Sequence, residues 1–504
     1  MRPTFLGFEA SKTAIFLNQK ALDITGHNLS NVSTEGYTRQ RVVQTSNYTD
    51  NTKSRYAAIK GINDGEGVNM KGVNQVRNER LDVSYRTQNK EVGYFEQKNN
   101  MLSNVENILQ EFDEGKNGNG YAISNSLYEI YTALEDFSNN PASEADANVV
   151  ATSFDGMAQT LNSLYRNLDE YSRQCKDELQ IKIDNLNTTF SKIAQLNDSI
   201  KTSVIANGYT DEFGPNELMD ERNMLLDEIS AYGDTSVVKN IDGTVDVTFN
   251  SHKVIEGNVS DSVHMQEDKS SGTVSLTWFS DGESADTGIG SLKAYTDIIN
   301  GAGVNAADGQ SVENGVIYYK NKLDNFAAKM ADVFNNMIPA SKDADGNVTS
   351  YVKIFGAYDS KGNINPEIPC SASDISITKE IQQDSSILIE DKNVADNTNI
   401  LRMITALTED EYSFDEGTFT GTFSDFVNDY VGTLGSDVNY TENRAAAVSN
   451  IADEILNSRD SVSGVSESEE TVNMLTYNRA YQAAARMMTV MDDLLDVLIN
   501  QMAV

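Results

Sequence analysis

Few residues of this chain have the types and spacing that catalysis or metal binding requires. Among its 504 residues the metal-binding or nucleophilic side chains are scarce: His27, His252, His264, Cys175 and Cys370. A structural zinc site takes four ligands, usually closely spaced cysteines and histidines, and no such group occurs. Cys175 lies on a stripe of apolar residues that recur at helical spacing, so we expect it to be a core side chain. A disulfide between the two distant cysteines is not expected.

A possible calcium loop begins at Asp343, Asp345 and Asn347. An EF-hand loop needs glycine at its sixth position and glutamate at its twelfth. Here those positions are Val348 and Ile354. The segment therefore predicts a turn rather than a cation site.

Composition argues against several classes of function. Gly288-Ile289-Gly290 lacks the strand and helix of a dinucleotide site, and no phosphate-binding loop motif occurs. With 39 Lys and Arg against 76 Asp and Glu, most carboxylates must be solvated surface groups rather than acid–base pairs. The net charge of −37 also disfavours nucleic acid, whose phosphates attract basic side chains. We predict a protein that is not an enzyme and that needs no cofactor or metal.

The sequence also gives no indication of a membrane-spanning helix or of a cleaved signal peptide. No stretch approaches the roughly 18 apolar residues of a membrane-spanning helix. The segment that begins at Met1 mixes polar and apolar residues, so we expect no cleaved secretory signal and no membrane insertion.

The N-terminal segment predicts a helix with apolar residues on two sides. One face is a repeat at seven-residue spacing: Phe8, Ile15, Leu22 and Leu29. Leu17 and Ile24 project from nearly the opposite face. Such a helix must be covered on both sides, and it should end within residues 28–36, where Asn, Ser, Thr and Gly cluster.

The C-terminal segment predicts the most regular helix of the chain. Apolar residues alternate spacings of three and four: Met474, Tyr477, Tyr481, Ala484, Met488, Met491, Leu495, Leu498 and Met502. Ser466 and Glu469 form a capping-box pattern that marks its start. A single stripe of this kind is typical of a core helix. Apolar helices at both termini instead favour packing between subunits.

The ends also differ in charge. Residues 1–60 hold eight Lys and Arg against four Asp and Glu, and residues 466–504 hold two against six. Ends of opposite sign can attract one another within a chain or between chains.

Between the ends the chain is predominantly helical with two other segments. A long apolar stripe covers 143–205, and further helices are expected near 80–112, 217–232, 316–338, 393–408 and 440–460. Alternation at Val245, Val247 and Phe249, and again at 274–278, predicts β-hairpins, while 341–378 predicts loops and short strands. We predict a mainly α fold with paired, coiled-coil-like terminal helices (1–59 and 465–504), a helical-bundle shaft (60–235, 286–340 and 376–464) and a small β-rich insert (236–285 with 341–375).

Three runs carry a resemblance to a known family. The run Ala21–Asn31 followed by Gly36-Tyr37-Thr38-Arg39-Gln40 resembles the N-terminal signature of bacterial flagellar axial proteins, which comprise rod, hook and hook-associated proteins. The run from Tyr477 to Arg486 is similar to the C-terminal signature, and Asn216–Leu226 is similar to an internal one. The Gly36–Gln40 ending is most similar to the hook-associated proteins of the hook–filament junction.

This resemblance implies a structural subunit that assembles through its termini. The implied N-terminal contact residues are Phe8, Ile15, Leu22, Asn28, Leu29, Asn31, Gly36, Tyr37, Arg39 and Gln40, and the C-terminal ones are the stripe from Met474 to Met502. Implied partners are copies of the chain, the hook protein, the next junction protein, an export chaperone at the C-terminal helix and the flagellar type III export apparatus. The implied location is outside the cell, on the flagellum. Another axial protein, or a secreted adhesin that displays the β insert, are the alternatives.

Overall fold

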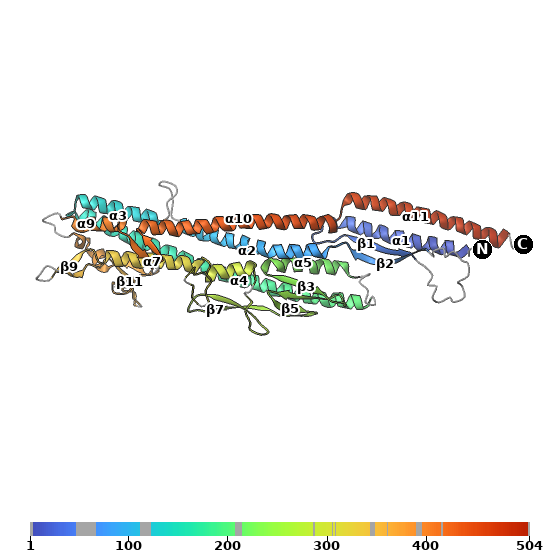
Figure 1. Ribbon diagram of the computed structural model, residues 1–504, viewed down its shortest axis with the longest axis horizontal. Coiled ribbons are helices and arrows are strands. Elements are labelled where there is room, and N and C mark those ends of the chain that lie inside the picture. The colour runs from blue at the N-terminus through green and yellow to red at the C-terminus, as the bar shows by residue number, and fades with distance from the viewer. Residues whose placement is uncertain are drawn as a thin grey trace.

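The protein is a long rod of lengthwise helices (Figure 1). This computed structural model describes residues 4–46, 67–110, 122–206, 214–285, 288–304, 306–307, 309–342, 348–359, 361–389, 396–414 and 417–501. Its main helices are α1 (Thr4–Ser30), α2 (Glu79–Gln110), α3 (Ala122–Asn139), α4 (Glu144–Ala206), α5 (Asn216–Tyr232), α6 (Ser291–Asn300), α7 (Val316–Phe334), α8 (Lys379–Gln383), α9 (Thr398–Thr408), α10 (Phe423–Ser463) and α11 (Glu467–Asp496). Short helical turns follow at Ser385–Leu388 and Val497–Gln501.

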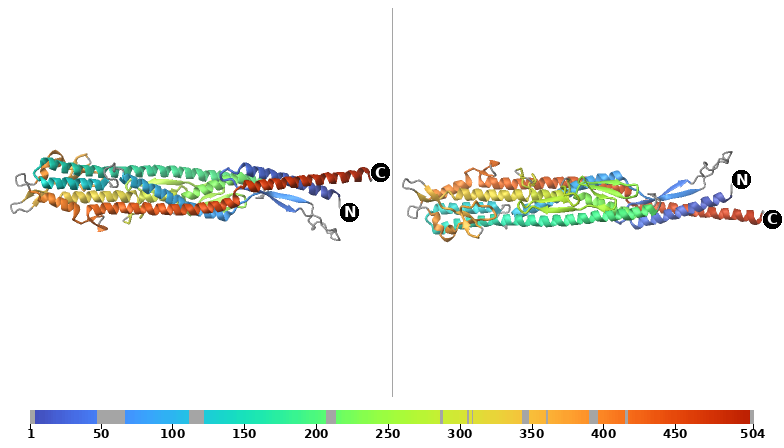
Figure 2. Two further views of the ribbon diagram at one scale, coloured as in Figure 1. Left: turned by 90° about the horizontal axis from the view of Figure 1, so that it is seen from above. Right: turned by 90° about the horizontal axis from the view of Figure 1, so that it is seen from below.

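The first and last helices lie side by side at one end of the rod, with both chain termini (Figure 1). They run antiparallel, since Gly7 lies against Met491 while Asn28 donates a hydrogen bond to Glu470. Helix α11 reaches beyond the first described turn of α1 (Figure 2). The paired terminal helices are confirmed.

Helix α4 is the spine of the remaining bundle, with 63 residues. Its predicted stripe is buried at nearly every position: Leu161, Leu164, Leu168, Cys175, Leu179, Ile183, Leu186, Phe190, Ile193 and Ile200. Helices α2 and α10 pair alongside it, and α3 and α7 complete the far end. The long helical shaft therefore has a continuous core of its own.

Strands occur in separate small sheets. The hairpin β1 (Gln40–Ser46) and β2 (Val68–Gln75) packs on α1. One flank of the shaft carries β3 (Thr235–Lys239), β4 (Val245–Phe249), β5 (His252–Glu256), β6 (Val259–Ser260), β7 (Val263–Glu267) and β8 (Val274–Trp278). Nearer the far end lie β9 (Pro339–Lys342), β10 (Val348–Tyr351), β11 (Phe355–Tyr358), β12 (Ile364–Asn365), β13 (Ile375–Ile377), β14 (Tyr412–Phe414) and β15 (Phe419–Gly421).

These strands agree with the predicted alternation. Val245, Val247 and Phe249 are buried while the residues between them are half-buried, so one face of β4 meets the shaft. The mainly α fold class with mid-chain strands is confirmed. The two strand-rich segments, 235–278 and 339–377, share no sheet and lie at different places along the rod (Figure 1). The predicted domain boundaries stay a prediction.

Two elements differ from the sequence expectations. Helix α10 begins at Phe423 rather than near residue 440, where Thr422 and Asp425 form a reciprocal capping box. The β1–β2 hairpin was not predicted. Strand β1 lies within 1–59, the predicted terminal helical region, and β2 lies at the start of the predicted helical shaft. Within the described residues, none of the helices has the length and apolar character needed to cross a membrane.

Candidate assembly site

The centre of the α1–α11 contact is made of small and polar side chains. On α1 the buried residues are Ser11, Ala21, Thr25 and Asn28. Small side chains let two helix backbones approach closely, as at Gly7, where an added Cβ would lie 2.4 Å from the Met491 side chain. The predicted apolar repeat, Phe8, Ile15, Leu22 and Leu29, flanks this line and is only half-buried.

The two apolar sides of α1 have different neighbours. One side lies along α11, and the other contacts the β1–β2 hairpin, where the Val68 amide donates a hydrogen bond to Thr13 Oγ1. The chain thus supplies part of the cover that a two-sided helix needs.

The predicted C-terminal stripe lies toward α1 but is not fully covered. Its half-buried members are Met474, Tyr477, Ala484, Met488, Met491 and Leu495, while Tyr481 is 37% exposed. The side chain of Leu498 and the whole of Met502 lie outside the described residues. Helix α11 begins where predicted, since Ser466 Oγ accepts a hydrogen bond from the Glu469 amide.

The loop after α1 joins the terminal helices through polar contacts, several of them buried. Asn28 Oδ1 accepts from Tyr37 Oη at 2.8 Å and from the Gln40 amide at 3.0 Å. Arg39 contacts Glu469 and Glu470, each at 2.8 Å.

The opposite charges of the two ends therefore meet within one chain at this loop. Gly36 adopts φ +76°, which favours glycine. Asn31 closes α1 by donating from its side chain to the His27 carbonyl. The part that these residues play in an assembly stays a prediction.

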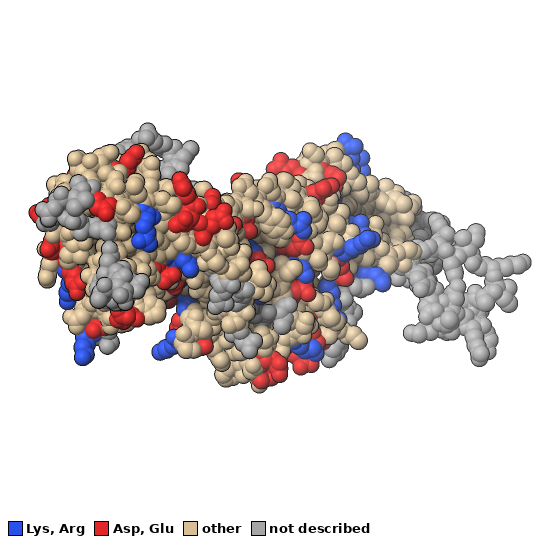
Figure 3. Space-filling model, turned by 60° about the vertical axis from the view of Figure 1, so that its left-hand side comes forward, with Lys and Arg blue, Asp and Glu red and all other residues tan. Residues whose placement is uncertain are grey.

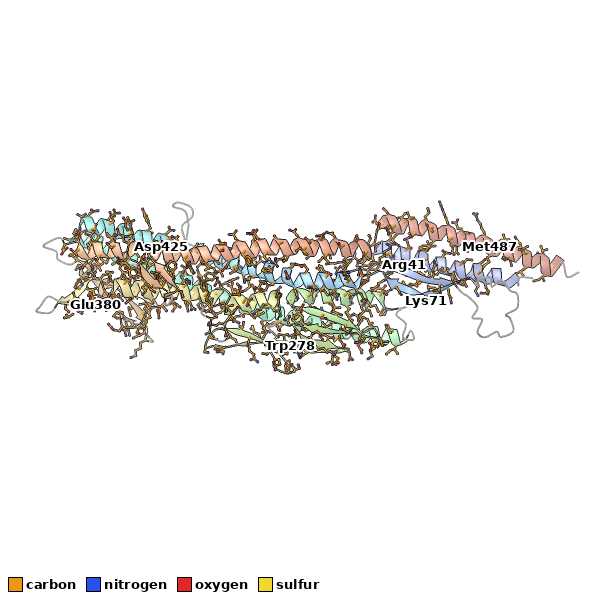
Figure 4. The ribbon with its side chains drawn as sticks, viewed as in Figure 1. Arg41, Lys71, Trp278, Glu380, Asp425 and Met487 are labelled. Atoms are coloured by element: carbon orange, nitrogen blue, oxygen red, sulfur yellow. The ribbon has the colours of Figure 1, made fainter. Side chains whose placement is uncertain are left out.

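Helix α11, together with Val497 directly after its last residue, also carries an apolar row that the sequence analysis did not predict. Met487, Val490, Leu494 and Val497 are 50%, 51%, 54% and 41% exposed, so large apolar side chains face solvent. We call these four residues the exposed row; Figure 4 labels Met487 on α11. Their spacing of three, four and three repeats the heptad rule beside the predicted stripe. The same spacing is present in the sequence, where the longer stripe from Met474 to Met502 predicts the contact face.

Charge separates the two parts of the molecule. Residues 79–463, the shaft, contain 27 Lys and Arg against 64 Asp and Glu, a net charge of −37. Residues 1–78 and 464–504, the terminal region, contain 12 of each and are neutral. Acidic side chains accordingly spread over the shaft surface (Figure 3). Like-charged shafts repel one another, whereas the terminal regions can approach without that cost.

The residues that could have carried chemistry have structural surroundings. His252 stacks on Trp278 and contacts Asp261 at 2.9 Å, which links two sheets on the shaft flank. Burial raises the pKa of the Cys175 thiol to about 12 and that of Cys370 to about 11.

Asp343 and Asp345 lie outside the described residues. Within the described part of the chain, no group of three or more His, Cys, Asp or Glu side chains could hold a metal ion.

Comparisons with known proteins agree on one family. The profile described as "Flagellar hook-associated protein FlgK helical domain" matches residues 102–352, and the profile "Flagellar basal body rod FlgEFG protein C-terminal" matches residues 457–502. Flagellar hook-associated protein 1 of Bacillus subtilis is 29% identical and aligns with 100% of this chain and 99% of its own length. The protein of the same name from Salmonella typhimurium is 21% identical over 96% of this chain and 97% of its own.

One solved structure supports the fold. The flagellar hook junction protein FlgK from Burkholderia pseudomallei matches with a TM-score of 0.56 at 11% identity, covering 76% of this chain and 100% of that one.

Proposed function

Because this chain belongs to the flagellar hook-associated protein 1 family, we propose that its copies join at the terminal region and build the hook–filament junction. The chain is a structural subunit of the bacterial flagellum. The shared names of its relatives favour this role over a secreted adhesin or another axial protein.

The observation that carries the proposal is the exposed row on α11. Four large apolar side chains at heptad spacing make one side of a second helix–helix contact, and within the described residues no helix covers them. Half-burial leaves each side chain about 1 kcal/mol of unrealised transfer free energy. A neighbouring copy that covers the row recovers about 4 kcal/mol in all.

The neutral charge of the terminal region supports the same contact. Copies arranged around an axis bring identical surfaces close together. A surface that carries the −37 charge of the shaft would resist this, whereas the terminal region has no net charge to overcome. We therefore place the terminal regions at the centre of the assembly and the shafts outside it.

The remaining partners follow from the family. We propose the hook protein on one side of the junction and the next junction protein on the other, an export chaperone on α11 before assembly, and passage through the flagellar type III apparatus. The location is then outside the cell, reached without a cleaved signal. The role requires neither catalysis nor a cofactor.

The test is the triple variant Met487→Asp, Val490→Asp and Leu494→Asp. These positions are exposed in the single chain, so the melting temperature of the monomer should hardly change. In cells that lack their own copy of the gene, flagella should end at the hook, because burying three unpaired carboxylates costs several kcal/mol.

The matched control is Thr489→Asp, which adds a carboxylate at an exposed position off the row. It should leave filaments intact. Full-length filaments in the triple variant would refute assembly through the exposed row.

A further inference from the structure

Two short segments connect the terminal region to the shaft, 76–78 before α2 and 464–466 between α10 and α11. The loop 31–39 after α1 lies beside both, since the Arg39 amide donates to the Ser463 carbonyl and the Val76 amide donates to the Arg39 carbonyl. We call this place the elbow. No helix runs through it. A cleft of about 920 Å³ also opens there, between the 31–39 loop, α5 and the adjoining ends of α10 and α11. The angle between the terminal region and the shaft is therefore not set by a continuous helix, and it is not set by close packing on the cleft side.

Helix α5 contains the internal run Asn216–Leu226, whose purpose the assembly contacts do not explain. Its first turn reaches the terminal region. Asn216 Nδ2 donates to the Val73 carbonyl at 3.1 Å and to Gln40 Oε1 at 3.2 Å. Asp220 accepts from the Thr38 amide at 3.1 Å and from Gln75 Nε2 at 2.7 Å.

The later turns of α5 bind the shaft through hydrogen bonds and ion pairs. Arg222 is buried and donates to Asn197 on α4 at 2.9 Å and to the Gly243 carbonyl in the β3–β4 turn at 2.8 Å. Asp227 accepts from Arg86 on α2 at 2.7 Å and pairs with Arg459 near the end of α10.

One rigid helix therefore holds three elements of the terminal region at one end and four of the shaft at the other. The terminal-side partners are the 31–39 loop and both strands of the hairpin, and the residues contacted are Thr38, Gln40, Val73 and Gln75. The shaft-side partners are α2, α4, α10 and the β3–β4 turn.

We propose that α5 is a splint that fixes the angle between the terminal region and the shaft, with Asp220 and Gln75 as its latch. Asp220 is 7% exposed, so its hydrogen bond with Gln75 is shielded from water. Asn216, whose contacts support the latch, is 6% exposed. Other contacts cross the elbow: the Arg39 amide donates to the Ser463 carbonyl, and Arg77 donates to Thr38 Oγ1 at 3.3 Å. The first joins the 31–39 loop to the last residue of α10, and the second joins that loop to the 76–78 linker. The hairpin itself is held to the shaft by α5, through Gln40, Val73 and Gln75.

The splint is a property of the single chain and stands whether or not the assembly proposal is right. Its consequence for the junction rests on that proposal. A fixed elbow presents the exposed row of every copy in one orientation, so that neighbouring copies can meet in register.

The test measures the angle directly in the full-length chain. Cysteines introduced at the exposed positions Glu442 on α10 and Thr476 on α11 carry a spin-label pair. Cys175 and Cys370 are buried, and a chain without the introduced pair verifies that they stay unlabelled. The parent chain should give one narrow distance distribution. Asp220→Ala should lose that narrow peak while the circular-dichroism melt of the shaft is kept.

Two further variants keep the test decisive. Gln75→Ala breaks the same latch from the hairpin side and should broaden the distribution in the same way. Glu221→Ala lies on α5 but is exposed, so it should leave the distribution narrow. Equal narrow distributions in Asp220→Ala and Gln75→Ala would overturn the splint. If the distance distribution broadens in variants that still build junctions, α5 fixes the angle between the terminal region and the shaft, but assembly does not depend on it.

Discussion

Removing the Arg39 side chain should destabilise the terminal region more than neutralising its partner Glu470. The Glu470 side chain is only 3% exposed, and Arg39 Nε contacts it at 2.8 Å. Its other contacts are weaker: Asn28 Nδ2 donates at 3.2 Å and Asn473 Nδ2 at 3.4 Å. Without Arg39, a buried carboxylate keeps only amide donors.

The two substitutions differ in what they leave unpaired. Breaking a buried ion pair from one side costs about 3–5 kcal/mol, and the 22% exposure of Arg39 lowers this to about 2–4 kcal/mol for Arg39→Ala. Glu470→Gln is milder, because Arg39 keeps Glu469 at 2.8 Å and the amide can still accept hydrogen bonds. We expect about 1–2 kcal/mol for it. The double variant should be more stable than Arg39→Ala alone.

The assay is native-state hydrogen exchange on amides of α1 and α11, which gives the free energy of opening of the terminal region. Exchange in the middle of α4 is the internal reference and should not change. A larger loss for Glu470→Gln than for Arg39→Ala would refute the reasoning, because it would mean that the carboxylate is not the group left buried.

Three further outcomes follow from single residues. Burial raises the pKa of Asp220 to about 6, above its ordinary 3.8, so the folded chain binds the proton more tightly than the unfolded chain does. The contribution of this group to the free energy of unfolding therefore rises as the pH falls through 6. In urea melts, the stability of the parent chain relative to Asp220→Asn should be greater at pH 5 than at pH 7.5. Gly93→Ala should lower the melting temperature because its Cβ would lie 2.1 Å from a backbone carbonyl oxygen of α5, whereas Gly156→Ala in α4, with nothing within 4 Å, should be neutral or slightly stabilising. Thiol titration should find Cys175 and Cys370 both free, and reactive only after denaturation.

The sequence indicated the helices whose apolar residues form one long face. The α4 stripe was predicted because its burial is continuous over 63 residues, so the periodicity is read many times. The start of α11 was predicted because a cap is a local signal: Ser466 needs only the next turn to accept its hydrogen bond.

The missed elements depend on distant partners. The strands β1 and β2 are separated by 47–67 in the chain and show no clean alternation, since Gly72 and Val73 are both buried. Helix α10 has Gly432 and Gly435 in its first part, which weaken the local helical signal. Burial of Phe423, Phe426 and Tyr430 in the shaft core overrides that weakness.

The candidate site was predicted in its location but not in its chemistry. Apolar periodicity pointed to the terminal helices, yet the buried residues of α1 include Ser11, Ala21 and Asn28, which a search for large apolar residues passes over. The elbow contacts of Asp220 and Arg222 could not be predicted at all, because their partners lie on four other elements. The internal run was recognisable only as a resemblance.

The free energy gained by covering the exposed row decides whether free subunits associate before they join the flagellum. Its roughly 4 kcal/mol is about the free energy of a millimolar complex, and losing translational freedom consumes much of it. Repulsion between shafts of −37 adds to the cost, more so at low ionic strength. The purified chain should therefore sediment as a monomer at micromolar concentration, and added salt should favour self-association. In a closed ring each copy makes at least two such contacts, so a growing tip that holds several copies can retain the next one. A stable dimer at low salt would contradict this account, because it would require an interface stronger than the exposed row provides.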